Sequence, residues 1–243
     1  SGSNAGLGKD FSGNGNYWTT NNISVTAGTT YDAMIDSPTM GASGTQPVGN
    51  YAVMNPLIKS YASQSYTLSN ANLQVTDTSS GGGWGLATIS ATSGKWYYEG
   101  TATAVAKNIG IGWTTLSNIA FNYAGTYQKT GAVTNTTGSA VTSLSSYTTN
   151  DVIGVAVDVD AGKVWFAKNG TWNGDPVAGT GQSFTFTANT ESSATFCIDN
   201  SAGTSGFAIN HGQRPFAYTP PTGFKALCTT NLPDSTVKKG NIY

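Results

Sequence analysis

The sequence has few charged residues and no long hydrophobic run, and both shortages exclude classes of function. Lysine and arginine number 11 against 12 acidic residues, and charged residues make up 9% of the 243. So little net charge leaves no electrostatic footprint for nucleic acid or for an anionic membrane. No apolar run approaches the roughly 20 residues that span a bilayer. We therefore expect neither nucleic-acid binding nor membrane insertion.

Histidine and cysteine are also scarce, which argues against metal and catalytic sites. His211 is the only histidine, and Cys197 and Cys228 are the only cysteines. No zinc-ligand spacing is present. Two buried free thiols are favoured over a disulfide in a chain of this length, with the bridge left open as the alternative. We predict no metal, no cofactor and no enzymatic activity.

Two weaker hypotheses about chemistry involve acidic side chains. Asp158 and Asp160 could serve as a glycosidase pair, which needs two carboxylates about 5 to 10 Å apart, but Asp160 begins a turn in which aspartate makes local hydrogen bonds. The same residues with Asn173 and Asp175 could contribute to a calcium site, but the density of acids is too low. A polysaccharide-degrading enzyme is kept as a minor alternative.

Glycine, aromatic and β-branched residues are abundant, and they favour an all-β protein. Glycine accounts for 31 residues and aromatic residues for 11%. β-Branched and aromatic side chains suit half-buried strands, whereas glycine and asparagine suit turns.

The clearest strand pattern lies in residues 151–172. Apolar residues alternate on one face before and after a polar break at residues 160–163: Ile153, Val155, Val157, Val159, Val164 and Phe166. This alternation predicts a β-hairpin. Asn169 and Gly170 both tolerate the positive φ of a tight turn, so a second reversal is predicted there.

A second strand is predicted at residues 109–114. Ile109, Ile111 and Trp113 share one face, and we expect Trp113 in the core. Gly110 and Gly112 clear the other face, which suits the close approach of a neighbouring backbone.

Four stretches, in order, resemble the SPRY domain of B30.2 modules. They are Gly-Lys-Trp-Tyr-Tyr-Glu at 94–99, Ile-Gly-Ile-Gly-Trp at 109–113, the hairpin that ends in Val-x-Phe-x-Lys-Asn-Gly at 164–170, and Asn-His-Gly-Gln-Arg-Pro-Phe at 210–216. The resemblance implies a two-sheet antiparallel, concanavalin-like β-sandwich.

Two residues depart from the family pattern within these stretches. Gly100 stands where the family usually has a β-branched residue, and His211 stands where phenylalanine is common. We interpret His211 as a structural replacement for an aromatic residue, and Glu99 and Asp151 as acceptors for backbone donors in the SPRY-like core.

The sequence predicts three regions. Residues 1–60 form an extended lead-in packed on the sandwich, 61–222 the SPRY-like sandwich, and 223–243 a C-terminal tail or linker. Pro220 and Pro221 end regular strand pairing because proline cannot donate to a ladder. The lead-in is too rich in large apolar residues for a disordered linker. Those expected to be buried are Tyr17, Trp18, Tyr31, Tyr51, Met54 and Leu57.

The lead-in also suggests an origin. Strings within residues 7–25 and 32–57 resemble a connecting region of large structural proteins of tailed bacteriophages. The resemblance implies a virion protein, such as a tail fibre or head appendage, located on the particle surface. The chain begins Ser-Gly-Ser-Asn, so we expect a piece of a longer protein.

The expected ligand surface consists of loops. Residues 116–147 form the longest stretch without a strand pattern, and 171–181 a second polar loop; in SPRY domains the corresponding loops form the ligand surface. Exposed aromatic rings beside amides can stack on a sugar or anchor a peptide. Partial burial of each aromatic ring is an equal alternative. The candidate ligand-binding residues are Asn122, Tyr123, Tyr127, Tyr147, Trp172, Asn173 and Asp175.

These features predict a non-catalytic recognition module of a phage virion protein that binds a host-surface glycan or protein. The alternative is a structural module that contacts other virion subunits, or forms a homo-oligomer, through its edge strands and N-terminal arm.

Overall fold

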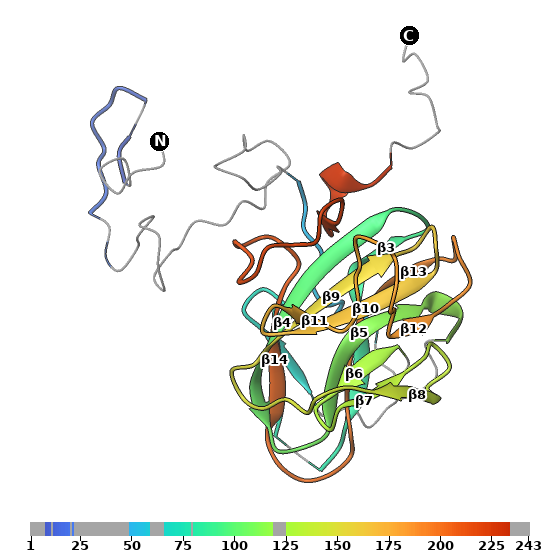
Figure 1. The fold of residues 1–243 in the computed structure, drawn as a ribbon. Helices are drawn as coiled ribbons and strands as arrows, with labels where there is room; N and C mark the ends of the chain where they lie inside the picture. Colours follow the sequence, from blue (N-terminus) through green and yellow to red (C-terminus); the bar gives the residue numbers. More distant parts are fainter. Residues whose placement is uncertain are drawn as a thin grey trace.

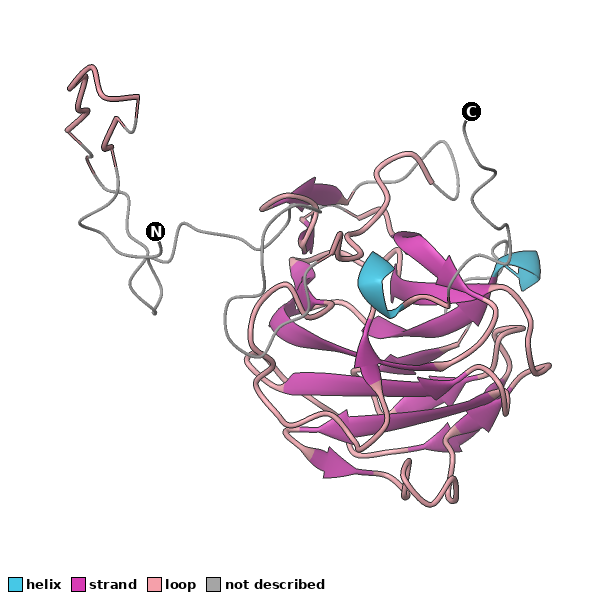
Figure 2. Cartoon of the chain, turned by 90° about the horizontal axis from the view of Figure 1, so that it is seen from above, coloured by secondary structure: helices cyan, strands magenta, loops and turns pink. Residues whose placement is uncertain are grey.

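The structure is a computed structural model that describes residues 8–10, 12–19, 21, 49–58, 66–78, 80–118 and 125–233. It is an all-β sandwich of two sheets, as predicted (Figure 1). Two short 3-10 turns, η2 (Leu116–Asn118) and η3 (Thr229–Asn231), are the helical pieces of the described chain (Figure 2). None of its helices is long and apolar enough to cross a membrane.

The larger sheet has nine strands in the order β1-β2-β14-β4-β9-β10-β11, with β12 paired to β10 and β15 paired in parallel to β4. Its strands are β1 (Thr67–Ser69), β2 (Gln74–Asp77), β4 (Lys95–Val105), β9 (Val152–Asp158), β10 (Lys163–Lys168), β11 (Thr171–Trp172), β12 (Phe184–Thr185), β14 (Ser205–Asn210) and β15 (Lys225–Ala226).

The smaller sheet has six strands in the order β3-β13-β5-β6-β7-β8. Its strands are β3 (Gly83–Ala91), β5 (Ile109–Thr115), β6 (Thr126–Gln128), β7 (Ala132–Thr134), β8 (Ala140–Ser143) and β13 (Ser192–Ile198). All of these strands pair antiparallel with their neighbours.

The predicted central hairpin is confirmed. β9 and β10 pair from Asp158 opposite Lys163 to Ile153 opposite Lys168. Asn169 and Gly170 adopt positive φ values of 49° and 79° at the reversal that leads into β11. Alternate residues of the hairpin therefore face either the second sheet or the outer side, and this alternation creates the surface described below.

The side chains between the two sheets form one large core, which includes Trp113, as predicted. Gly100 faces this core. A Cβ at Gly100 would lie 2.5 Å from Cδ1 of Ile111 in the opposite sheet. Ile111 thus occupies the space that a β-branched residue would need, which explains the departure from the family pattern at Gly100.

Gly110 and Gly112 admit a neighbouring strand, as predicted. A Cβ at Gly112 would lie 1.9 Å from the carbonyl oxygen of Gly125, and one at Gly110 would lie 2.9 Å from that of Tyr127. The neighbour is β6, in the stretch expected to be a long loop. Residues 116–147 contain β6, β7 and β8, and strands of three or four residues are too short to give a periodic signal.

The lead-in is only partly packed on the sandwich. Tyr51 and Met54 are buried, and residues 53–55 hydrogen-bond along β3. Tyr17, Trp18 and Leu57 are exposed, contrary to the expectation that they are buried. Tyr31 lies outside the described residues.

The expected tail from residue 223 begins as part of the fold. Phe224, Leu227 and Cys228 are buried, and β15 pairs with β4. Both cysteines are free and buried, which confirms the prediction of two free thiols.

His211 is a core residue, in agreement with its interpretation as a replacement for an aromatic side chain. It is fully buried, and its ring stacks on Tyr98 at a centroid distance of 5.1 Å. Burial disfavours the charged imidazolium and lowers the pKa of His211 to about 4.

This buried imidazole predicts an acid-dependent loss of stability. The unfolded chain protonates the ring near its ordinary pKa of 6.5, whereas the folded chain does so only near 4. The free energy of unfolding should therefore fall by about 3 kcal/mol as pH drops through that window. In His211→Phe this contribution should be absent, as measured by urea unfolding at several pH values. Parallel pH curves for the variant and the wild type would contradict the prediction.

Candidate functional site

The outer face of the nine-stranded sheet carries a second aromatic cluster. Tyr97, Ala156 and Trp165 lie side by side in one row across β4, β9 and β10. The adjacent row contains Glu99, then the small residues Gly154 and Ala167, and ends at Trp172 on β11. Because cross-strand partners share a face, the side chain of Trp172 lies on this outer face.

Tyr97 is the centre of the cluster. Its buried ring lies 4.8 Å from the ring of Phe216 in an edge-on arrangement and 6.1 Å from that of Trp172. Both neighbours are only half-buried and pack against the cluster. Trp172 and Phe216 therefore each have one side fixed by Tyr97 and another side open to solvent.

Glu99 binds the backbone of residues 217 and 218 to this face of the sheet. Glu99 is 3% exposed. Its carboxylate accepts hydrogen bonds from the Tyr97 hydroxyl at 2.7 Å, the Tyr218 N–H at 2.9 Å and the Ala217 N–H at 2.8 Å. The pKa of Tyr97 is raised well above its ordinary value. Burial is the larger cause, and the hydrogen bond and charge of the adjacent Glu99 are the next. The interpretation of Glu99 as an acceptor for backbone donors is confirmed.

Tyr218 lies over the β10–β11 turn. A Cβ at Gly170 would be 2.5 Å from Cδ1 of the Tyr218 ring, so the glycine provides the space for this ring. Tyr218 is 36% exposed. Trp172, Phe216 and Tyr218 together form what we call the aromatic surface.

Asp151 stabilises the turn between β10 and β11. Its carboxylate accepts bonds from the Thr148 N–H at 2.8 Å and the Asn169 side chain at 2.7 Å, and it pairs with Lys168 at 3.3 Å. Burial opposes ionisation of Asp151, but these bonds outweigh it and lower the pKa of the carboxyl group. Its interpretation as an acceptor for a backbone donor is confirmed. Asn169 also accepts a bond from the Val152 N–H at 2.8 Å, so the turn is held at both ends.

The loop after Trp172 is also fastened to the sheet. The indole N–H of Trp165 donates to the carbonyl of Thr180 at 2.9 Å, and Lys163 donates to that of Gly179 at 2.8 Å. Exposed Asp175 accepts bonds from the N–H groups of Val177 and Ala178, both at 2.9 Å. The aromatic surface thus lies beside a loop of fixed shape.

The structure places the predicted site residues in three groups. Trp172 is part of the aromatic surface, and Asn173 and Asp175 follow it in the next loop. Asn173 is half-buried, and its side-chain amide donates to the Phe166 carbonyl at 3.4 Å. The candidates Asn122 and Tyr123 lie outside the described residues.

Tyr127 and Tyr147 form the third group and lie in the core. Their exposed fractions are 0% and 2%, and each hydroxyl donates to a backbone carbonyl, that of Ser145 and that of Ile109. This corrects the expectation that they reach a ligand, because neither ring is accessible. The alternative of burial applies to both.

Phe216 and Tyr218 were not among the predicted site residues. The four family-like stretches end at Phe216, and the prolines that follow indicated only the end of strand pairing. The signal that could have identified them is an aromatic pair directly after the last family-like stretch.

The acidic residues considered for catalysis have structural partners. Asp158 pairs with Lys95 at 3.1 Å and accepts a bond from the Ala161 N–H, while Asp160 accepts one from the Gly94 N–H at 3.0 Å. Across the described part of the chain, no three histidine, cysteine, aspartate or glutamate residues are grouped as a metal site would require.

Comparison with known families assigns the central part of the sandwich. Residues 95–202 match the model of the SPRY domain. These residues are a SPRY domain. SPRY domains are typically protein–protein interaction modules and are generally non-catalytic. A search of curated protein sequences finds no match to the chain.

Three solved structures are similar to this chain. The SPRY domain of human HERC1 is 20% identical, with a TM-score of 0.52 over 65% of this chain and 96% of that one. A human SPRY domain is 15% identical, with a TM-score of 0.46 over 60% and 95% of the two chains. Stonustoxin is 17% identical, with a TM-score of 0.46 over 65% of this chain and 27% of that one. At this level of identity, the match with HERC1 shows a common fold only.

Proposed function

We propose that this SPRY domain is a non-catalytic recognition module that binds a partner protein through its aromatic surface. One observation carries the proposal: Trp172, Phe216 and Tyr218 are partly open to solvent, yet the backbone beneath them is fixed by Glu99 and Asp151. Aromatic side chains are frequent hot spots of protein interfaces. Rings that are already ordered lose little conformational entropy on binding.

Replacing Trp172 should separate recognition from folding. Peptide ligands are first selected from a random display library by their binding to the wild-type chain. These peptides should bind Trp172→Ala at least about tenfold more weakly than the wild type, because truncation of a hot-spot residue costs more than about 1.4 kcal/mol of binding free energy. The melting temperature should change little because Trp172 is half-buried at the sheet edge. Fluorescence anisotropy measures the affinities.

Val141→Ala is the matched control for this experiment, because it truncates an apolar side chain that is 48% exposed on β8. Selected peptides should bind it as they bind the wild type. Equal binding to the wild type and Trp172→Ala would place recognition elsewhere.

We also propose that the module belongs to a phage virion protein and recognises a host-surface protein or glycan. This finer proposal is supported only by the strings in residues 7–25 and 32–57, most of which lie outside the described residues. Saturable binding of the labelled chain to candidate host cells and purified envelope glycans, lost in Trp172→Ala, would support it. No binding to any host material would count against it.

One observation favours the alternative of contacts between subunits. β8 is an edge strand whose four residues are all exposed, and among the described strands it pairs with β7 alone. Such an edge can pair with another strand. Sedimentation of the full chain as a dimer or larger oligomer would favour this alternative, whereas a monomer at all concentrations would favour the recognition module.

A further inference from the structure

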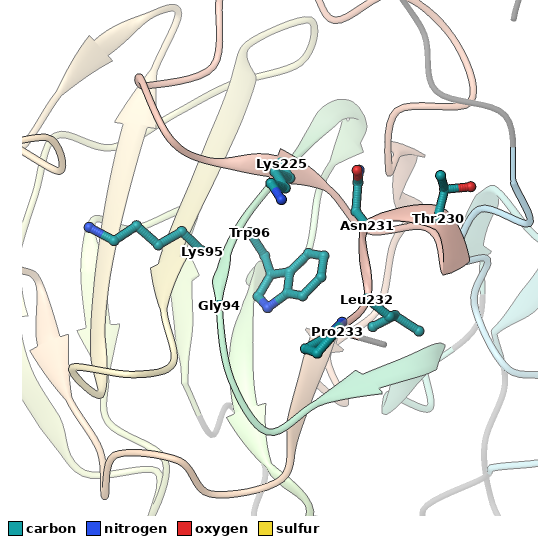
Figure 3. Close-up of a pocket in the computed structure, with 8 residues that line it drawn as sticks. All are labelled: Gly94, Lys95, Trp96, Lys225, Thr230, Asn231, Leu232 and Pro233. Atoms are coloured by element: carbon teal, nitrogen blue, oxygen red, sulfur yellow. The ribbon is translucent and has the colours of Figure 1, made fainter. Parts of the chain in front are cut away.

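A pocket of about 280 Å³ lies where β15 pairs with the start of β4 (Figure 3). It is separate in sequence from the residues of the aromatic surface. Its lining combines an apolar part, formed by Trp96, Leu232 and Pro233, with a polar part, formed by Lys225, Thr230 and Asn231.

The apolar part is built on a fixed indole. The Trp96 side chain is buried, and its N–H donates to the carbonyl of Ser93 at 2.9 Å. A Cβ at Gly94 would lie 3.3 Å from the Trp96 ring, so the glycine allows the chain to pass close to the indole. Because its only polar atom is already bonded, the indole offers carbon atoms to the pocket. Leu232 and Pro233 add further apolar surface.

The charged groups of the lining are all positive. Among the described residues, two lysines and no acidic residue line the pocket. The ammonium group of Lys95 is occupied by Asp158 at 3.1 Å and lies 5.5 Å from the Phe224 ring centre. In Figure 3 the Lys95 side chain extends away from the indole of Trp96.

Lys225 is the cation that remains available. It is exposed, and the three ion pairs of the described residues involve Lys95, Lys107 and Lys168 instead. Next to it, Asn231 uses one amide hydrogen for the Ala226 carbonyl at 2.9 Å, which leaves the second one free to donate.

We propose that this pocket binds a peptide carboxylate at Lys225 and places the adjoining apolar side chain against Leu232 and Pro233, with the largely buried Trp96 lining the pocket beside them. The volume lies just below the roughly 300 to 1,000 Å³ of small-molecule sites, so it fits one residue of a larger ligand. The one positive charge of Lys225 matches the single negative charge of a carboxylate, whereas a phosphate group carries about −1.5 to −2 and would be only partly neutralised.

This inference rests on the proposed function only in taking the partner to be a protein, since the pocket shares no residue with the aromatic surface. The carboxylate can come from a chain terminus or from an acidic side chain. Both sources present the same charged group to Lys225, and the experiment must distinguish them.

The test is a nuclear magnetic resonance titration of the full, isotopically labelled chain with three short probes. The first is acetyl-Gly-Gly-Leu with a free C-terminal carboxylate, the second is its C-terminal amide, and the third is acetyl-Gly-Glu-Leu-amide. The free acid should saturably shift the Trp96 indole N–H and the amides of Lys225 and residues 230–232, and the uncharged amide should not. Similar shifts with the third probe would show that an acidic side chain also serves, and their absence would assign the pocket to chain termini.

Two variants make the test decisive. Lys225→Gln should weaken binding of the free acid about fivefold, which is the size expected for one exposed ion pair. Lys9→Gln removes the same charge from an exposed position of the lead-in and should change nothing. The proposal is overturned if the acid and the amide shift the same resonances equally, if Lys225→Gln binds like the wild type, or if no saturable shift occurs. These outcomes leave the Trp172→Ala experiment unaffected.

Discussion

Asp77→Ala is expected to lower the free energy of unfolding by about 3 to 5 kcal/mol. Asp77 at the end of β2 and Lys107 after β4 form an ion pair of 3.1 Å in which both side chains are fully buried. Lys107 also donates to the carbonyl of Gly81, and its backbone N–H donates to Ser205 at 2.7 Å. Removing the carboxylate leaves a buried ammonium group without its counter-charge. Denaturant unfolding measures the loss.

Two further variants test this explanation. The double replacement Asp77→Leu with Lys107→Met removes both charges and should recover most of the lost stability, because paired removal leaves no uncompensated charge. Lys168→Met breaks the half-buried pair with Asp151 and should cost no more than about 1 kcal/mol, because this pair stays open to solvent on one side. A double variant as unstable as Asp77→Ala would show that packing, not charge, is responsible.

Glu99→Leu is expected to lower the free energy of unfolding by at least about 4.5 kcal/mol and to abolish partner binding. The variant leaves the N–H groups of Ala217 and Tyr218 and the hydroxyl of Tyr97 without their acceptor, and bonds to a charged group contribute about 1.5 to 3 kcal/mol each. Phe216 and Tyr218 would then lose their fixed position over the sheet. Unfolding measurements give the stability, and the peptide affinities described for Trp172→Ala give the binding.

Glu191→Leu is the matched control, because the exposed Glu191 carboxylate accepts a hydrogen bond from the Ser90 hydroxyl at 2.7 Å. It should change stability by about 0.5 kcal/mol or less and leave binding intact. If amide exchange at Ala217 and Tyr218 is as slow in Glu99→Leu as in the wild type, then Glu99 does not hold this segment.

The strands in which apolar and polar residues alternate strongly could be predicted from the sequence. The role of Gly110 and Gly112 could be predicted as well. The hairpin of β9 and β10 repeats apolar residues with period two because one face is buried, and Gly110 and Gly112 indicate the close approach of β6. β6, β7 and β8 could not be predicted, since strands of three or four residues carry too few alternations.

The candidate site was only partly predictable because tyrosine suits both a binding surface and a core. Tyr127 and Tyr147 are buried because their hydroxyls find backbone carbonyls, and a sequence does not show whether such an acceptor is present. Tyr218 reaches the site through Glu99, a contact across 119 positions of the chain. A contact of that range follows from the fold and not from any local pattern.

The most direct test of the account is hydrogen–deuterium exchange of the wild-type chain with and without a selected peptide. If the aromatic surface is the recognition site, the peptide should slow exchange in residues 168–173 and 216–219 and leave β8 unchanged. Protection confined to β8, with residues 168–173 and 216–219 exchanging as in the free chain, would contradict it.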